Sequence, residues 1–254
     1  MTSLALRGLS KKFANVVALD QASLDVSAGE FLVIVGESGC GKTTTLRLIA
    51  GLEQPDAGTI FIGGAPVNDV PVGRRNVQMI FQNYALWPHM KVFEERRYSN
   101  LSLPLKVRQW SSDRIVEFLR PLAWKIGIEE SFFKRKPSEL SGGQQQRVAL
   151  GRAMVTSPRI MLMDEPLCNI DPPNRLKMRQ EILAFHKEHQ LTTLYVTHNL
   201  ADGMAMADRI AVMHKGKFEQ TDTPANLLNH PASEYVADFF RAEQFGKRAF
   251  APQR

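Results

Sequence analysis

The stretch from Gly36 to Thr43 reads GESGCGKT, a spacing of glycine, lysine and hydroxyl residues that is typical of phosphate-binding loops. Its glycines allow consecutive backbone N–H groups to close around phosphate oxygens, and a helix that starts here adds roughly half a positive charge at its N-terminus. In this pattern Lys42 reaches the β- and γ-phosphates of a nucleotide, and the hydroxyl of Thr43 holds Mg²⁺. These residues therefore predict a site for a nucleoside triphosphate and its metal.

Polar side chains also follow three predicted strands, at the place where ligands bind in α/β sheets. Gln82 comes after VQMIF, Asp164 and Glu165 come after IMLM, and His198 follows shortly after TTLYV. Two adjacent carboxylates in a protein with a phosphate-binding loop predict one group for Mg²⁺ and one for water. Taken singly, each motif has a plainer interpretation as a solvated glutamine, a solvated turn or a structural histidine.

A second pair of glycines opens a later helix. Leu140 to Arg147 reads LSGGQQQR, in which Ser141 is a natural N-cap and the glycines bring backbone N–H groups close to whatever lies at the helix end. This stretch predicts a second anion site, whose phosphate must come from a partner. Nearer the N-terminus, Phe13 is either a core side chain or an exposed ring that stacks on a base, and its position leaves both readings open.

The predicted strands and helices place these residues where the chemistry needs them. The apolar run Phe31 to Val35 predicts a buried strand directly before the phosphate-binding loop, and KTTTLRLIAGL from Lys42 predicts a helix that stops at Gly51. Residues 4–35 read as short β segments, and the stretch from about 87 to 137 reads as helical. An amphipathic helix at 112–126 and strands at 58–63, 77–81, 160–163 and 192–196 complete the pattern.

The composition excludes several classes of protein. The 254 residues are 44% apolar, which is enough for a substantial core and argues against disorder. No apolar run approaches the ~20 residues needed to cross a bilayer, and MTSLALRGLSKK lacks a signal-peptide core, so an intracellular protein is expected. Two cysteines, Cys40 and Cys168, make neither a disulfide framework nor a metal motif. The net charge of +6 is scattered and by itself assigns no partner.

The chain resembles the ATP-binding cassette (ABC) family, and more narrowly the ATPase subunit of an ABC importer. Five features carry this resemblance by occurring in one order: GESGCGKT, Gln82, LSGGQQQR, IMLMDEP and His198. The resemblance runs from about residue 4 to 240. It implies an α/β fold, with a P-loop NTPase core, an N-terminal antiparallel β subdomain and an inserted α-helical subdomain. Residues 1–240 would form this single nucleotide-binding domain, with a helical lobe at about 87–157 and a C-terminal tail at 241–254.

In this family two subunits pair head to tail, and each ATP lies between the phosphate-binding loop of one copy and the LSGGQ stretch of the other. By resemblance Lys42 holds phosphate, Glu165 is the general base, and His198 contacts the γ-phosphate. Phe13 stacks on adenine, and Mg²⁺ is held or sensed by Thr43, Gln82 and Asp164. The implied ATP-binding residues are Phe13, Gly36, Glu37, Ser38, Gly39, Cys40, Gly41, Lys42, Thr43, Thr44, Ser141, Gly142, Gly143, Gln144 and Asp171, of which Ser141, Gly143 and Gln144 act on the other copy's ATP.

Within the family, RRNVQMIFQNYALWPHMKVFE and SELSGGQQQRVALGRAMV are most similar to sugar-type importers and to related polyamine, ferric-iron and osmoprotectant systems. The implied function is ATP hydrolysis that powers uptake of a small solute, foremost a carbohydrate. The implied partners are a second copy or a paralogue, multi-span permease subunits and, indirectly, a solute-binding protein, with no nucleic acid. The implied location is the cytoplasmic face of the inner (plasma) membrane. Many such proteins carry a C-terminal regulatory β domain, which is expected to be absent here.

The chain departs from the family pattern at three places. Cys168 replaces a common serine, a proline pair follows Asp171, and EERRYSNLSLPL after Phe93 is about five residues longer than usual. The added residues 95–99 are either a partner-specific contact or a longer solvated loop. Two other functions stay open, a soluble ABC ATPase linked to nucleic acid and a regulatory module that binds ATP without hydrolysis. Cys40, at a helix N-terminus, is expected to have a lowered thiol pKa.

Overall fold

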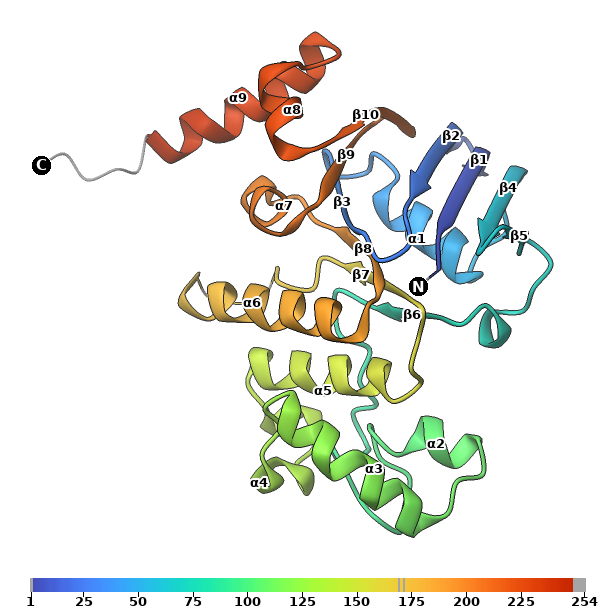
Figure 1. Ribbon diagram of the computed structural model, residues 1–254, viewed down its shortest axis with the longest axis vertical. Coiled ribbons are helices and arrows are strands. Elements are labelled where there is room, and N and C mark those ends of the chain that lie inside the picture. The colour runs from blue at the N-terminus through green and yellow to red at the C-terminus, as the bar shows by residue number, and fades with distance from the viewer. Residues whose placement is uncertain (1, 169, 171, 249–254) are drawn as a thin grey trace, which may run out of the picture. The chain divides into compact units, whose positions relative to one another are not determined.

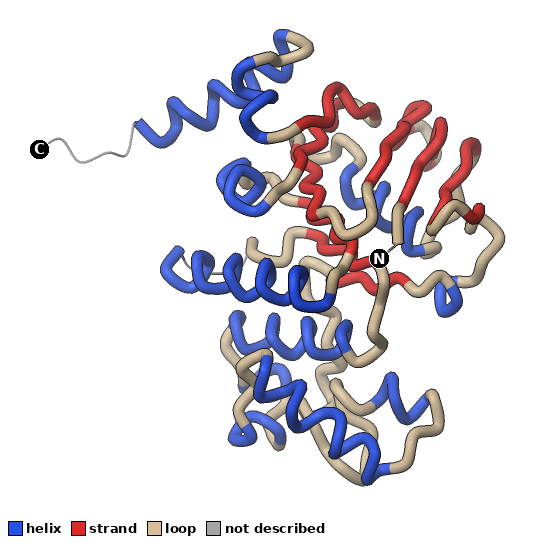
Figure 2. Tube along the Cα trace, viewed as in Figure 1, coloured by secondary structure: helices blue, strands red, loops and turns tan. Residues whose placement is uncertain are grey.

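The computed structural model describes residues 2–168, 170 and 172–248, and the chain forms two compact units. The first unit joins Met1–Val77, Arg159–Asp164 and His186–Arg254, and the second joins Gln78–Pro158 and Glu165–Phe185. Figure 1 follows the chain through both units. Figure 2 shows that strands dominate the first unit and helices the second.

An antiparallel sheet begins the first unit. Its strands are β1 (Leu4–Phe13), β2 (Val16–Val26), β4 (Ala57–Ile62) and β5 (Ala65–Pro66), in the order β2-β1-β4-β5. β1 and β2 form a hairpin in which Phe13 pairs with Val16, and Ala14 adopts a φ of 48° in the tight turn between them. The β-rich start that the sequence predicts is therefore confirmed.

A second, mainly parallel sheet lies at the centre of the first unit. Its strands there are β3 (Phe31–Val35), β7 (Ile160–Asp164), β8 (Thr192–Val196), β9 (Arg209–His214) and β10 (Lys217–Asp222), in the order β10-β9-β3-β8-β7. β10 is antiparallel to β9, and the other neighbours are parallel. Every residue of β3, β7 and β8 is buried, which explains why their sequences do not alternate between apolar and polar residues.

Buried polar side chains at the start of β8 are paired. Thr192 donates its hydroxyl hydrogen to the carbonyl of Thr2 at 2.7 Å, and the hydroxyl of Thr193 hydrogen-bonds Nδ1 of His186 at 2.9 Å. Burial lowers the pKa of His186, so the imidazole is favoured in its neutral form. A strand that begins with two threonines can therefore lie inside the sheet.

Helices of the first unit are α1 (Lys42–Ala50), α7 (Leu200–Met206), α8 (Pro224–Asn229) and α9 (Glu234–Arg248), with a 3₁₀ turn η1 (Val72–Arg74). α1 begins inside the phosphate-binding stretch and ends at Gly51, whose φ of 79° closes the helix, as the sequence predicts. Among the helices that the structure describes, none is both long and apolar enough to cross a membrane.

Arg75 closes the C-terminal end of α1. Its guanidinium group donates to the carbonyls of Leu48 at 2.8 Å and Ile49 at 3.1 Å, and also to those of Val70 and Asn68. The residue is only 3% exposed, and burial lowers its pKa. A buried cation at the negative end of a helix dipole thus satisfies carbonyls that the helix leaves unpaired.

β6 (Val77–Ile80) carries the chain from the first unit into the second. The helical elements that follow are α2 (Leu103–Val107), α3 (Ser112–Lys125), α4 (Glu130–Phe133), the 3₁₀ turn η2 (Pro137–Glu139), α5 (Gly142–Met154) and α6 (Pro172–His189), the last of which ends in the first unit. α3 confirms the predicted amphipathic helix to within one residue, and Ser111 caps its N-terminus.

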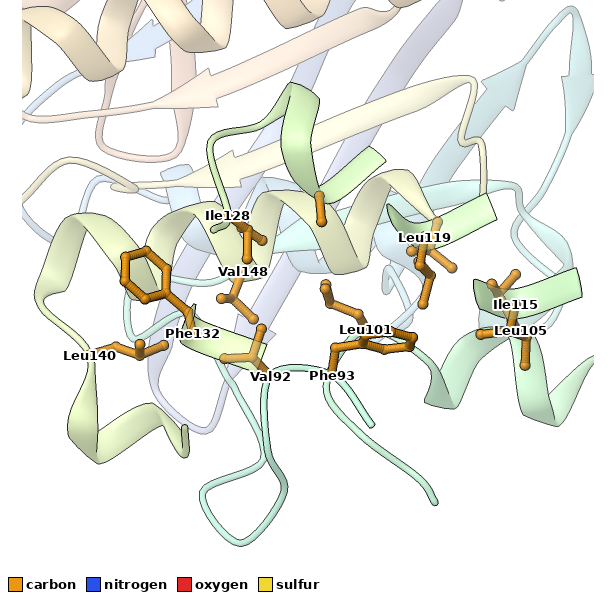
Figure 3. Close-up of a cluster of buried hydrophobic side chains, with 12 residues drawn as sticks. Val92, Phe93, Leu101, Leu105, Ile115, Leu119, Ile128, Phe132, Leu140 and Val148 are labelled. Carbon is orange, nitrogen blue, oxygen red and sulfur yellow. The ribbon is translucent and has the colours of Figure 1, made fainter. Parts of the chain in front are cut away.

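The core of the second unit forms where α3 and α5 meet the segments around them (Figure 3). α3 contributes Ile115, Leu119 and Ala123, which recur every four residues and so share one face of the helix. Gly151 lets α5 pack closely, because a side chain there would come within 2.6 Å of Ile126. The helical pattern of the sequence therefore reflects a distinct core in this unit.

Replacing Arg75 by methionine should lower the free energy of unfolding by about 3 kcal/mol, because buried carbonyls at the end of α1 lose their donor. Urea unfolding followed by circular dichroism measures the change. Arg74→Met is the matched control, since Arg74 is exposed, and it should move stability by less than about 0.5 kcal/mol. Equal midpoints for the two variants would show that Arg75 has no such role.

Candidate functional site

Three parallel strands end at one edge of the central sheet. In their register Ile34 of β3 lies opposite Val196 of β8, and Val196 lies opposite Asp164 of β7. The phosphate-binding stretch starts one residue after β3 ends, and Asp164 is the last residue of β7. The sheet thus brings two predicted site segments, far apart in the sequence, to the same edge.

The phosphate-binding loop needs glycine at two positions because other backbone groups pass close to it. A side chain at Gly36 would overlap the carbonyl of Met213, and one at Gly41 would lie 2.5 Å from the carbonyl of Ala18. Gly41 also has a φ of 113°, which L-residues rarely adopt. The glycines of the motif therefore allow both the loop's curvature and its close packing.

Lys42 makes contacts within this loop, and Thr43 connects the loop to the sheet edge. Lys42 is 6% exposed, and its ammonium group donates to the carbonyls of Gly36 and Glu37, each at 2.8 Å. The exposed Thr43 donates its hydroxyl hydrogen to Oδ1 of Asp164 at 3.0 Å. A hydroxyl and a carboxylate oxygen at this spacing are the hard ligands that Mg²⁺ prefers, so the residues present fit that ion.

Cys40 differs from its sequence-based expectation. The residue is 6% exposed, and burial raises the pKa of its thiol, although the nearby Lys42 partly offsets this effect. The prediction of a lowered thiol pKa is therefore wrong. The helix N-terminus does favour a thiolate, but removing the sulfur from water disfavours the charged form more strongly here.

Phe13 has its side chain at the surface. It is 41% exposed at the tip of the β1–β2 hairpin, and the ammonium of Lys11 lies 5.2 Å from the centre of its ring. The core-packing alternative is thereby excluded. Val16 and Val17, across the hairpin, are also exposed at 66% and 56%, and sequence reasoning did not single them out. Phe13 and Val16, which lie opposite each other in the hairpin, present an apolar surface on which a flat ring could stack.

The remaining predicted catalytic residues fall in different units. His198 is exposed in the first unit, two residues beyond β8, where Asn199 caps α7. Gln82 is exposed in the second unit, two residues beyond β6. Glu165 begins the second part of that unit and has a φ of 46°, which few residues other than glycine adopt.

The LSGGQ stretch forms the helix start that was predicted. Ser141 accepts a hydrogen bond from the N–H of Gln144, and the side chain of Gln144 accepts one from the N–H of Ser141. A side chain at Gly143 would meet nothing within 4 Å, so packing in this chain does not require glycine there. Thr44 lies in the first turn of α1 and Gly142 in that of α5, whereas Asp171 lies outside the described residues.

Arg152 holds the segment that follows Gln82, a contact that sequence reasoning missed. It donates from α5 to the carbonyls of Ala85 at 2.6 Å and Tyr84 at 3.0 Å, and it lies 4.7 Å from the ring of Trp87. Burial lowers the pKa of Arg152 to about 10, which still leaves it charged at neutral pH. The loop after Gln82 and the LSGGQ helix are therefore joined within the second unit.

Tyr235, also missed, lies near the phosphate-binding loop. Its ring stacks on His214 with centres 3.8 Å apart. Burial raises the pKa of Tyr235 to about 12, and the charges of Glu37 and Cys40 add to the effect, so its hydroxyl stays neutral. No local motif in the sequence signals this contact, because Tyr235 begins a helix close to the C-terminus.

The raised pKa of Cys40 predicts slow modification of its thiol. In a Cys168→Ser variant Cys40 is the remaining cysteine. At neutral pH its thiol should react with Ellman's reagent much more slowly in the folded protein than in the protein unfolded by urea. The rate should rise as the pH approaches and passes the raised pKa, since only the thiolate attacks. A native rate equal to the unfolded rate would contradict the burial of Cys40.

A family model described as ABC transporter matches residues 19–168. Three curated relatives are 46% identical over 94% of this chain: the trehalose/maltose import ATP-binding protein MalK of Thermococcus litoralis, the osmoprotective compounds uptake ATP-binding protein GgtA of Synechocystis, and the xylose/arabinose import ATP-binding protein XacJ of Haloferax volcanii. The chain spans 64%, 64% and 61% of the lengths of these proteins.

Solved structures agree with the family match. A bacterial ABC transporter cassette, solved as a dimer, has a TM-score of 0.77 and 29% identity over 87% of this chain and 98% of that one. A dimeric post-hydrolysis cassette bound to ADP and Pi has a TM-score of 0.73 and 30% identity over the same shares. The predicted α/β architecture is therefore confirmed. By its family match, its relatives and its fold, the chain belongs to the ABC transporter family.

Proposed function

We propose that this chain is the ATP-binding and ATP-hydrolysing subunit of an importer for a small solute, with carbohydrate as the substrate class. The observation that carries the proposal is the 3.0 Å contact of Thr43 with Asp164, which joins a phosphate-binding loop to a carboxylate at one sheet edge. The relatives named above support import over a nucleic-acid role, since each is named an import or uptake protein.

Binding of ATP would use the ammonium group of Lys42, which already lies within the phosphate-binding loop. Lys42 donates to two loop carbonyls, and the same ammonium hydrogens can turn to β- and γ-phosphate oxygens. Thr43 and Asp164 would hold Mg²⁺, which neutralises phosphate charge when bound. The exposed ring of Phe13 would stack on adenine, with Val16 beside it.

Hydrolysis would need a base and donors placed around the γ-phosphate. We assign Glu165 as the group that takes the proton from the attacking water, because it directly follows Asp164, the proposed Mg²⁺ ligand. His198 would donate to the γ-phosphate from beyond β8, and Gln82 would orient the water and metal. Phosphoryl transfer depends chiefly on such positioning and charge stabilisation.

A second copy of the chain would complete each site. Gly143 has open space at its Cβ position, so the start of this helix leaves room for the phosphate of another molecule to approach its main chain. Ser141, Gly143 and Gln144 would donate to the ATP of the partner copy, and Asp171 would contact the partner's site. Both solved cassettes named above are dimers, which supports this arrangement.

The remaining expectations belong to the same proposal. Residues 1–240 would act as one nucleotide-binding domain, with the helical lobe at about 87–157 facing the transport machinery. Multi-span permease subunits would hold the protein at the cytoplasmic face of the membrane, and a solute-binding protein would deliver the substrate to them. The second ATPase subunit would be a further copy of this chain or a paralogue of it.

Glu165→Gln should keep ATP binding and lower turnover about 10²–10⁴-fold, because an amide cannot accept the proton of water. Steady-state phosphate release measures turnover, and equilibrium dialysis measures binding. Glu117→Gln, at an exposed position on α3, makes the same chemical change away from the site and should turn over ATP normally. Turnover close to that of the unchanged protein in Glu165→Gln would remove Glu165 from this role.

Phe13→Ala should weaken ATP binding about tenfold, the equivalent of about 1–2 kcal/mol of lost aromatic stacking. Phe13→Tyr retains the ring and serves as the control. Titration calorimetry with a non-hydrolysable ATP analogue gives both dissociation constants. If alanine and tyrosine bind the nucleotide equally well, adenine does not stack on this ring.

A further inference from the structure

A cavity of about 740 Å³ opens in the second unit, within the part of the chain that follows Gln82. Its lining includes one carboxylate, that of Glu94, and five cationic side chains, those of Lys91, Arg96, Arg97, Lys106 and Lys136. Glu94 pairs with Lys91 at 3.4 Å, and the other four cations form no ion pair with the described residues. We call this feature the basic cavity.

The loop 93–99, which supplies two of these cations, is fixed at both ends. The main-chain N–H of Asn100 donates to the carbonyl of Lys91 at 2.9 Å, and that of Leu101 donates to the carbonyl of Val92 at 3.0 Å. The buried side-chain amide of Asn100 donates to three carbonyls of the preceding segment. The added residues therefore project from a rigid base, which a freely solvated loop would not require.

Side chains from outside the loop hold its main chain and leave its guanidinium groups available. The ammonium of Lys106 donates to the carbonyl of Arg97 at 2.8 Å, and the hydroxyl of Ser102 donates to the same carbonyl at 3.3 Å. Arg96 and Arg97 are exposed, and their side chains make no hydrogen bond or ion pair with the described residues. Arg96 and Arg97 thus offer two guanidinium groups to the basic cavity that they line.

We propose that the basic cavity binds an acidic segment, rich in aspartate or glutamate, of the membrane-embedded partner subunit. The proposal rests on the proposed function for the existence of that subunit, and it adds the chemistry that the subunit must present. Arginine binds carboxylates through two parallel hydrogen bonds, and an anion here also relieves repulsion between the crowded cations. The added residues 95–99 thereby specify one class of partner.

The residues that line the basic cavity suit a polypeptide better than a small phosphate ion. Tyr98 is 59% exposed at the cavity, and tyrosine and arginine are the side chains enriched at protein interfaces. A small-ligand site encloses most of its ligand and fixes it with a few converging polar groups. Here Arg96, Arg97 and Lys136 are all exposed, so an extended segment can run along them.

The test uses a charge-reversed double variant, Arg96→Glu with Arg97→Glu, and a control pair with the same change in charge, Arg108→Glu with Lys134→Glu. The control positions are exposed in the same unit and do not line the cavity. If the charge-reversed variant unfolds, Arg96→Ala with Arg97→Ala replaces it, because this pair removes the two positive charges without introducing negative ones. Thermal melting and ATP turnover of the isolated chain should be the same in all of these proteins.

The first readout is fluorescence anisotropy of a labelled peptide in which glutamate alternates with leucine. It should bind the unchanged chain and the control pair, weaken about tenfold or more in the reversed variant, and weaken with added salt. The same peptide with glutamine in place of glutamate should not bind. Equal affinity of all proteins for the acidic peptide would overturn the proposal.

Two further probes separate other sources of negative charge. Pyrophosphate should displace the peptide only at much higher concentration, and vesicles containing phosphatidylglycerol should bind the reversed variant and the control alike. Displacement by micromolar pyrophosphate, or vesicle binding lost only in the reversed variant, would assign the cavity to a phosphate or to the membrane surface instead.

The second readout is assembly with the chain's own membrane subunits after co-expression. The reversed variant should co-purify with them less than the control pair does, while its isolated ATP turnover stays normal. Normal assembly of the reversed variant would overturn the proposal. Lack of ATP turnover in the unchanged chain would instead overturn the proposed function. The peptide-binding assay does not depend on turnover, so it would still test whether the basic cavity binds an acidic segment.

Discussion

Parallel strands that end at one edge of a buried sheet are the constraint on which the rest of the structure depends. β3, β8 and β7 are held in register by main-chain pairing, and all of their side chains are buried. Their register sets Ile34 beside Val196 and Val196 beside Asp164, so the ends of the three strands meet at one edge of the sheet. For this reason the loop after β3 meets Asp164, and the hydroxyl of Thr43 reaches its carboxylate.

Cationic side chains in both units donate to main-chain carbonyls. Arg75 closes the end of α1, Arg152 holds the loop after Gln82, and Lys42 spans the phosphate-binding loop. Each fixes a local backbone shape while remaining a charged donor. For Lys42 this has a functional consequence, because the hydrogens that hold the loop carbonyls are the same ones that phosphate oxygens can accept.

Local signals in the sequence were enough to determine much of the fold. The strand, loop and helix around Gly36 to Thr43, the N-cap at Ser141 and the amphipathic helix α3 all lie where predicted. Each depends on residues close together in the chain, on hydrophobic period, or on a capping side chain, so neighbours suffice to specify it. β9 and β10, by contrast, were not predicted.

The surroundings of individual side chains were decided only by the tertiary structure. The sequence left Phe13 open between core and surface, and it gave no sign that Cys40 would be buried or that Tyr235 would lie near Glu37. The sequence likewise did not reveal that loop 93–99 has a fixed base. Exposure and pKa depend on which distant segments displace water from a group, and segments far apart in the chain become neighbours only when the sheets and helices pack.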